Sequence, residues 1–290
     1  MIKRMHKVAI TLFLLIVLQA QSSAEVFYKE FRKSLTVYPN VELGCDMSFA
    51  QMTVTTWDQN QMEIIIKVNA DVKSEKRAQE LFDCVLIQEG SAKVGIQIQP
   101  KGGWKGRENV NITVEVKMPA TGALLGNVAF GNVNVSSLKG RMEMQVSYGN
   151  LNVSELLSAD NDVEVSFGNS TIDVFGGGKF LCQYGNLKLR RVTGSSRVNE
   201  QFGNIDINKV SGECKSLELD CEYGNAYINA EGIGVTFDTE CSFGKLEVKG
   251  EHKTTYNAKD DFNTSTKGTS GNGGMTMDLD CSFGNIDLRL

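Results

Sequence analysis

Residues 281–290 read CSFGNIDLRL, and most of this stretch has already occurred several times upstream. An aromatic residue followed by Gly-Asn occurs seven times, and an eighth copy replaces only the Asn, by Lys245. Successive aromatic residues are 18, 19, 17, 18, 21, 20 and 40 residues apart. A period near 20 residues indicates a solenoid in which each copy forms one coil. The repeated residues are Phe130, Gly131, Asn132, Tyr148, Gly149, Asn150, Phe167, Gly168, Asn169, Tyr184, Gly185, Asn186, Phe202, Gly203, Asn204, Tyr223, Gly224, Asn225, Phe243, Gly244, Phe283, Gly284 and Asn285.

Apolar and polar residues alternate on both sides of each Gly-Asn pair. Ile286 and Leu288 flank Asp287, and Cys281 lies two residues before Phe283. This period of two is typical of strands with one buried face. We therefore predict two short strands per coil, with the aromatic residue and the residue two before it both facing inward. The alternation slips by one residue between the strands, so Gly-Asn is predicted to be the corner, because these residues accept left-handed backbone angles most easily.

Stacked coils would place equivalent residues above one another, about 4.8 Å apart. We therefore expect an aromatic ladder, an Asn ladder that links side-chain amides from coil to coil, and a ladder of valines and cysteines. Cys182, Cys221, Cys241 and Cys281 share one inward position. They are predicted to be buried and unreactive, and parallel stacked side chains are poorly placed for disulfides.

The repeats define the predicted domain organisation. Residues 1–24 resemble a signal peptide: basic residues precede a short apolar run, and small residues follow it. Residues 25–120 are predicted to form a small N-terminal α+β cap, which contains a degenerate first coil from Met47 and a helix that begins at Ser74. Residues 121–290 would form the repeats. The predicted fold is an all-β, single-stranded parallel β-helix with 17–21 residues in each coil and about eight or nine coils.

Two further segments carry local predictions. Residues 93–100 and 110–119 both alternate like strands and are predicted to pair as a hairpin, with Gly102-Gly103 in the connection. The double-length gap holds a polar insertion at about 251–274. It is interpreted either as a surface insertion around a degenerate coil or as a loop that contacts a ligand. A solenoid that ends on the strand at 281–290 would expose an edge, and residues 264–274 are expected to fold back over it.

Composition limits the class of partner. Without the leader, 27 basic residues face 35 acidic ones, for a formal charge of −8, which argues against nucleic acid. No later segment is apolar for long enough to cross a membrane. The sequence therefore predicts an exported protein of the periplasm or the cell surface whose partner is a glycan or an envelope protein.

The sequence offers no convincing catalytic, cofactor or metal site. His252 is the one histidine after the leader and has no evident nucleophile beside it. Cys214 and Cys221 lack the pattern of a zinc site, and the nonapeptide of calcium-binding β-rolls is absent. The outward carboxylates Asp206, Glu247 and Asp287 leave one enzymatic alternative open, a polysaccharide lyase or hydrolase of the β-helix type.

The serial SYGN, SFGN and QYGN motifs, the degenerate TVTTWD coil, the helix-bearing segment and VEVKMP together resemble the putative-adhesin families of secreted bacterial proteins, which are related to the head GIN domain. The resemblance spans nearly the whole chain after the leader. It implies a β-helix at the cell envelope and brings no catalytic residue. The function expected is that of a noncatalytic adhesin-like or scaffold protein.

Overall fold

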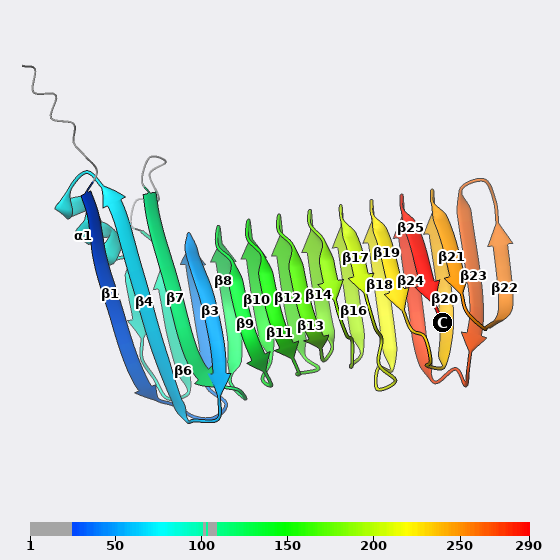
Figure 1. Ribbon diagram of the computed structural model, residues 1–290, viewed down its shortest axis with the longest axis horizontal. Coiled ribbons are helices and arrows are strands. Elements are labelled where there is room, and N and C mark those ends of the chain that lie inside the picture. The colour runs from blue at the N-terminus through cyan, green and yellow to red at the C-terminus, as the bar shows by residue number, and fades with distance from the viewer. Residues whose placement is uncertain (1–24, 101–102, 104–108) are drawn as a thin grey trace, which may run out of the picture.

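The computed structural model describes residues 25–100, 103 and 109–290. They form an elongated all-β molecule in which two large sheets face each other along its length, with the strands across the long axis (Figure 1). Most neighbouring strands are parallel, as expected for a repeat with two strands per copy. The all-β prediction is confirmed.

The sheets are called A and B here. In spatial order, sheet A consists of β1 (Glu25–Thr36), β4 (Gln61–Val72), β7 (Asn109–Pro119), β3 (Ala50–Trp57), β9 (Val133–Leu138), β11 (Leu151–Leu156), β13 (Ser170–Phe175), β15 (Leu187–Leu189), β17 (Asn204–Ile207), β19 (Asn225–Asn229), β25 (Asn285–Arg289) and β21 (Lys245–Lys249). Sheet B consists of β22 (Lys253–Lys259), β23 (Asn263–Ser270), β20 (Val235–Ser242), β24 (Met275–Ser282), β18 (Ser216–Glu222), β16 (Ser196–Gln201), β14 (Gly178–Gln183), β12 (Asn161–Ser166), β10 (Met142–Ser147), β8 (Ala123–Ala129), β2 (Glu42–Ser48), β6 (Lys93–Ile98) and β5 (Val85–Gln88).

The chain alternates between the sheets. Each repeat is a strand of sheet B, a corner with the aromatic residue and Gly-Asn, and a strand of sheet A, after which the chain returns to sheet B. Equivalent residues pair in register, for example Val146 with Val128 and Val165. Register is specified because a slip of one residue would turn the buried side chains outward.

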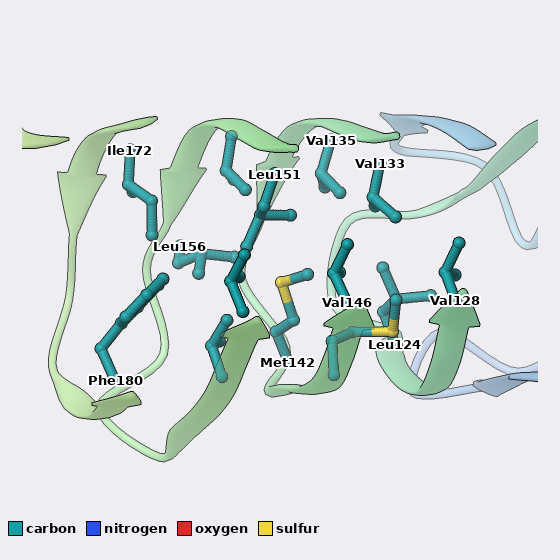
Figure 2. Close-up of a cluster of buried hydrophobic side chains, with 14 of the residues drawn as sticks. Leu124, Val128, Val133, Val135, Met142, Val146, Leu151, Leu156, Ile172 and Phe180 are labelled. Atoms are coloured by element: carbon teal, nitrogen blue, oxygen red, sulfur yellow. The ribbon is translucent and has the colours of Figure 1, made fainter. Parts of the chain in front are cut away.

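The core lies between the sheets. Figure 2 shows Val133, Val135 and Leu151 pointing from sheet A toward Val128 and Val146 of sheet B. All five side chains are buried. The same inward positions are apolar in most repeats, so the core is continuous along the molecule. Burial of each such side chain contributes on the order of 1.5–3 kcal/mol.

The N-terminal part confirms some predictions and corrects others. Helix α1 (Glu75–Phe82) begins after Ser74, whose hydroxyl accepts the Arg77 N–H, and it packs against β4. The helix ends at Phe82, and Val85 begins β5. The degenerate first copy occupies a normal corner between β2 and β3, with the Phe49 ring stacked on Phe130. The division at about residue 120 stays a prediction.

The predicted hairpin of residues 93–100 and 110–119 is wrong. Strand β6 lies in sheet B between β5 and β2, whereas β7 lies in sheet A between β4 and β3. Each of the two strands has another antiparallel partner: β6 pairs with β5, and β7 pairs with β4. Gly102, placed in the supposed turn, lies outside the described residues.

The last repeats are not stacked in sequence order. Strands β24 and β25, residues 275–289, lie between the repeat of Tyr223 and the repeat of Phe243. Cys221 and Cys241 belong to repeats that are consecutive in the sequence, but Cys281 lies between them. The crossover passes through two loops in contact: the Met275 N–H donates to the Gly234 carbonyl, and the Val235 N–H donates to Ser270 Oγ.

The polar insertion is a hairpin rather than a further coil. Strands β22 and β23 pair antiparallel, and β23 pairs antiparallel with β20. The hairpin thus extends sheet B beyond the terminal repeat, as Figure 1 shows at the end opposite α1. The expectation that residues 264–274 cover the edge of the strand at 281–290 is wrong, because β24 and β25 have a partner strand on both sides and β23 pairs with β20 instead. In sheet A the end strand among the described residues is β21.

Candidate functional site

The corner of each repeat holds the aromatic residues, and they point outward. The prediction that they face the core is wrong: the nine corner rings, from Phe49 to Phe243 in space, are 40–54% exposed. Each aromatic residue has φ between 54° and 64°. This left-handed conformation turns the side chain out of the core, and it accounts for the slip in the alternation. The left-handed residue is therefore the aromatic one, not Gly or Asn.

The predicted aromatic ladder is present. Successive rings lie 4.7–4.9 Å apart between centroids with interplanar angles of 1–12°. The order ends Tyr223, Phe283, Phe243, and Phe262 of the hairpin covers the last ring at a tilt of 40°. Each ring presents its edge to solvent because its faces are stacked.

The glycine of each corner is required by close packing of the backbone. A Cβ atom on any of the eight corner glycines would lie 1.5–2.0 Å from the carbonyl oxygen at the same position of the adjacent repeat. None of these glycines has a positive φ. The residue is glycine because adjacent corners touch, and its conformational freedom is not used.

The Asn ladder is also present. Asn186 Oδ1 accepts the backbone N–H of Asn204 at 3.2 Å and its Nδ2 amide at 2.9 Å. The same pattern starts at Gln51, whose Oε1 accepts the Asn132 N–H, and ends where Asn285 Oδ1 accepts the Lys245 N–H at 2.9 Å. Lys245 carries no amide to continue the ladder, and it lies in the terminal repeat. The ladder residues thus link the corners of adjacent repeats.

A groove of about 830 Å³ lies on the outer face of sheet B. It runs along the molecule across β14, β16, β18, β24, β20 and β23, and β22 adds Thr255 to its end. We call it the axial groove. The insertion that the sequence singled out thus contributes one end of the groove.

Register aligns the walls of the axial groove. Adjacent strands contribute one charged residue each to one wall, in the order Lys179, Arg197, Glu218, Asp278, Asp238 and Lys267. A row of hydroxyl groups runs beside this wall. On the parallel strands it lies two positions before the charged residues, and on the antiparallel strand β23 it lies two positions after Lys267. The row consists of Ser195, Ser216, Thr276, Thr236 and Thr269. Backbone of the intervening residues forms the floor. The groove can therefore offer ionic contacts on one side and hydrogen bonds on the other.

Asp278 is the central charge of the groove. Glu218 pairs with Arg197, and Asp238 pairs with Lys267, but no ion pair of Asp278 occurs in the part of the chain that the structure describes. Partial burial and repulsion from Asp238 raise the pKa of Asp278. Its neighbour along the strand, Asp280, has a pKa raised to about 6 by burial and by surrounding carboxylates.

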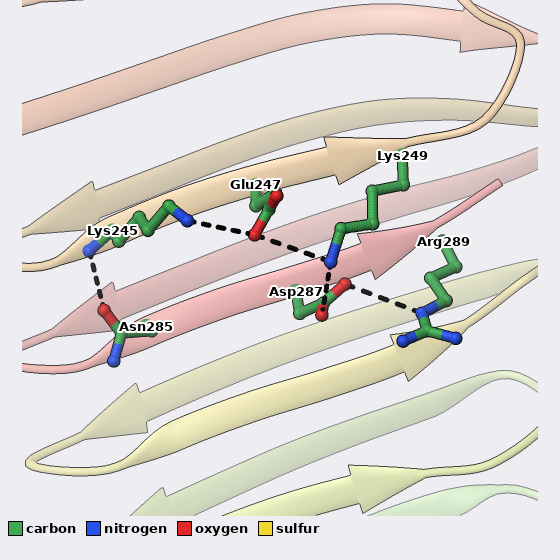
Figure 3. A network of polar contacts seen from close by, with 6 residues as sticks. All are labelled: Lys245, Glu247, Lys249, Asn285, Asp287 and Arg289. Carbon is green, nitrogen blue, oxygen red and sulfur yellow. Dashed lines mark hydrogen bonds and ion pairs between the residues drawn. The ribbon is translucent and has the colours of Figure 1, made fainter.

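The carboxylates considered for the enzymatic alternative lie on the other sheet and are paired with cations. Figure 3 shows Glu247 between Lys245 and Lys249, and Asp287 between Lys249 and Arg289. The pKa of Glu247 is lowered, first by the hydrogen bond from Lys245. A general acid needs the opposite shift. Asp206 is likewise paired, with Lys188 at 3.2 Å.

Glu200 is a residue that the sequence reading missed. It occupies the inward position that Cys182 and Cys221 hold in the adjacent repeats, it is 0% exposed, and neither carboxylate oxygen has a hydrogen-bond partner. Burial raises its pKa to about 8. The signal was readable, because Glu200 lies two residues before Phe202, as Cys281 lies before Phe283.

The cysteines are buried and free. Burial raises the pKa of Cys182, and the pKa of Cys241 is raised to about 11 for the same main reason. Both effects favour the unreactive thiol, and slow labelling of the native protein stays a prediction. His252 lies edge-on to Phe237, with ring centroids 5.6 Å apart. Among the described residues, no group of three or more His, Cys, Asp or Glu side chains is placed to hold a metal ion.

Helices long and apolar enough to span a membrane are absent from the described ranges, 25–100, 103 and 109–290. No family model matches the chain, and no curated protein matches it by sequence.

Solved bacterial structures are similar to this chain at low identity. A "putative adhesin" from Bacteroides fragilis NCTC 9343 is 11% identical, with a TM-score of 0.45 over 90% of this chain and 97% of that one. A "putative adhesin" from Parabacteroides distasonis ATCC 8503 is 13% identical, with a TM-score of 0.42 over 90% and 97%. A "putative cell adhesion protein" from Clostridium sporogenes ATCC 15579 is 10% identical, with a TM-score of 0.32 over 90% and 99%.

Proposed function

We propose that this chain is a noncatalytic, adhesin-like binding protein of the bacterial cell envelope, built as a parallel β-helix and exported after removal of residues 1–24. Its axial groove would bind an extended glycan. The observation that carries the proposal is the register of the groove walls, in which six adjacent strands align one charged row along the molecule and five of them align one hydroxyl row.

The chemistry of the walls suits a polymer of sugars. A glycan presents hydroxyl groups along its length, and the Ser216 hydroxyl can donate to and accept from them. The hydroxyls of Thr276 and Thr236 donate to the Lys215 and Gly273 carbonyls and can still accept a hydrogen bond from a sugar. Asp278 can accept two sugar hydroxyls in charge-assisted hydrogen bonds, which are stronger than neutral ones. Strand spacing of about 4.8 Å repeats these groups along the groove, so a ligand with its own repeat can be held at several points.

The test is binding on a glycan array, followed by titration of the best glycan with two matched variants. Asp278→Asn removes the central charge of the groove. Asp162→Asn removes an exposed carboxylate from the same row, which β12 places outside the axial groove. Loss of one charge-assisted hydrogen bond, about 1.5–3 kcal/mol, should raise Kd roughly 10- to 100-fold for Asp278→Asn. The control should bind like the unmodified protein. An array without any bound glycan, or equal Kd values for the two variants, contradicts the proposal.

Strand β24 also supplies the sharpest test of the enzymatic alternative. Asp280 lies two residues after Asp278, outside the residues that line the groove, and burial and nearby carboxylates raise its pKa to about 6. A carboxyl group with a raised pKa is what a glycosidase uses as its general acid. Release of reducing or unsaturated ends from a polysaccharide panel, lost in Asp280→Asn, would replace the binding proposal by a catalytic one. We expect no release.

A further inference from the structure

The segment formed by residues 275–290 lies in a slot made entirely by residues that precede it. Its strand β24 pairs with β18 on one side and β20 on the other, and β25 pairs in the same way with β19 and β21. All four pairings are parallel. Neither β18 with β20 nor β19 with β21 is paired, so removal of the segment would leave four strand edges unsatisfied.

The inserted segment contributes residues to the aromatic ladder, to the Asn ladder and to the core. The Phe283 ring lies 4.8 Å from both Tyr223 and Phe243. Asn285 Nδ2 donates to Asn225 Oδ1 at 2.7 Å. Six apolar side chains of the segment are at most 3% exposed: Met275, Met277, Leu279, Cys281, Ile286 and Leu288. The slot is therefore a complete binding site for a pair of strands that carries the repeat sequence.

The connection to the segment is short and rich in glycine. Residues 271–274 read GNGG, and Gly271 and Gly273 have φ values of 53° and 64°. These positive angles fold the chain back, so that Ser270 and Met275 lie on opposite sides of Val235. A rotation in these four residues would carry the segment away from its own slot without changing any contact inside the segment.

We propose that the slot accepts residues 275–290 from a second copy of this chain, so that two copies exchange these strands reciprocally. The contacts are identical in the closed monomer and in the exchanged dimer, because the segment and the slot are the same in both. The choice between them depends on the connection and on concentration. The intact chain is monomeric at low concentration, because its own segment is held next to its own slot.

The decisive variant removes residues 271–273. One residue, Gly274, then connects Ser270 to Met275, and the two Cα to Cα steps reach about 7.6 Å at most. The two strand spacings across Val235 require about 9.6 Å. The shortened chain cannot fill its own slot, whereas a second copy still can. The matched control adds four Gly and Ser residues between Asn272 and Gly273.

The expected result for the shortened variant is a dimer by multi-angle light scattering, with Cys281 as slow to alkylate as in the intact protein. Equal amounts of 15N-labelled and unlabelled chain, refolded together, should give a mixed dimer in native mass spectrometry. The lengthened control should be monomeric. A monomeric shortened variant, or one in which Cys281 alkylates rapidly, overturns the proposal.

A second measurement decides the question if the shortened variant does not fold. The intact chain is refolded from denaturant at increasing concentration as the same isotopic mixture. Exchange predicts a mixed dimer whose fraction rises with concentration and which persists after dilution, because its release requires that β24 and β25 leave the slot. An intact chain that returns only as monomer at every concentration overturns the proposal.

Discussion

The corners and the buried inner row formed by the residue two before each corner aromatic residue both run the length of the molecule. They differ in how much the residue type varies from one repeat to the next. Each corner repeats an aromatic residue and glycine with almost no change, whereas the inner row holds Met47, Val165, Cys182 and Glu200 at one position. The corners are constrained by backbone contacts that no side-chain movement can relieve. The inner row is constrained by volume, which several side chains satisfy. Sequence uniformity in this protein thus follows backbone proximity rather than burial.

The largest effect should come from a corner glycine. Gly185→Ala places a Cβ 1.8 Å from the Gly168 carbonyl oxygen, so two repeats must separate. We expect the free energy of unfolding to fall by at least about 4 kcal/mol, in the exceptional range for single substitutions. Chemical denaturation followed by circular dichroism measures it. The control is Gly212→Ala, whose nearest atom would be 3.7 Å away, and its effect should stay within about 0.5 kcal/mol. Similar losses in the two variants would refute the account of the corners.

The inner row should respond in the opposite direction. Glu200→Val replaces a buried acid by the residue that Val146 and Val165 place in the same row, and we expect a gain of about 3 kcal/mol at pH 7. The folded-state pKa of Glu200 is raised to about 8 from an ordinary value of 4.5. The folded protein therefore holds the proton longer than the unfolded chain, and stability falls as pH rises between these values, by about 1.4 kcal/mol per pH unit.

Denaturation from pH 4 to pH 9 checks this slope. Glu200→Val should remove it between about pH 6 and pH 8, whereas Asp280, whose pKa is raised to about 6, still contributes a slope below pH 6. Glu222→Gln, an exposed carboxylate of the next repeat, should leave the slope in place. A variant that keeps the full slope of the unmodified protein would show that another group is responsible.

The Asn row should give an intermediate effect. Asn186→Ala removes the acceptor of the Asn204 N–H and a side-chain bond to Asn169. The corner is exposed, so water can replace part of the loss, and we expect about 1–2 kcal/mol. Asn152→Ala is the matched control, because the Asn152 amide donates to the Asn134 side chain and, among the described residues, to no backbone group. Thermal unfolding should rank the two variants in this order, and equal melting temperatures would argue against a structural role of the ladder.

The smallest effect on stability belongs to Lys245→Asn. The change removes an exposed ion pair with Glu247, worth at most about 1 kcal/mol, and gives the terminal corner the amide that every neighbouring corner has. It also removes a positive charge from β21, which ends sheet A among the described strands, and charges on edge strands oppose pairing with other chains. We expect nearly unchanged unfolding but more self-association by sedimentation velocity. A variant as monomeric as the parent would assign Lys245 no protective role.

Much of this architecture could be predicted from the sequence, because the same motif recurs in every repeat. The period gave the strands, the stacked rings, the Asn ladder and the buried cysteines. The side of the aromatic residues was predicted wrongly, because the alternation was extended one residue too far: the positive φ at Phe283 and its equivalents reverses the direction of the side chain.

The order of the last repeats could not be derived from the period, which is the same for every coil. One local signal was available, because Lys245 interrupts the Asn ladder at the repeat that proves to be terminal. The groove could not be foreseen either. It depends on which charged residues become neighbours across strands, and Glu218 and Asp278 are brought together only by the insertion of β24.

The position of β24 and β25 also has a consequence for the time course of folding. A stack of repeats normally grows by addition of each new unit to the one made just before it. Here the repeat of Phe243 is synthesised before residues 275–290 but must leave room for them, since they end between it and the repeat of Tyr223. We therefore expect a competing early arrangement, in which Tyr223 stacks directly on Phe243 and which has to open before the native order forms. We expect a slow, concentration-independent refolding phase reported by burial of Cys281, and refolding with a single fast phase would show that the gap is kept open from the start.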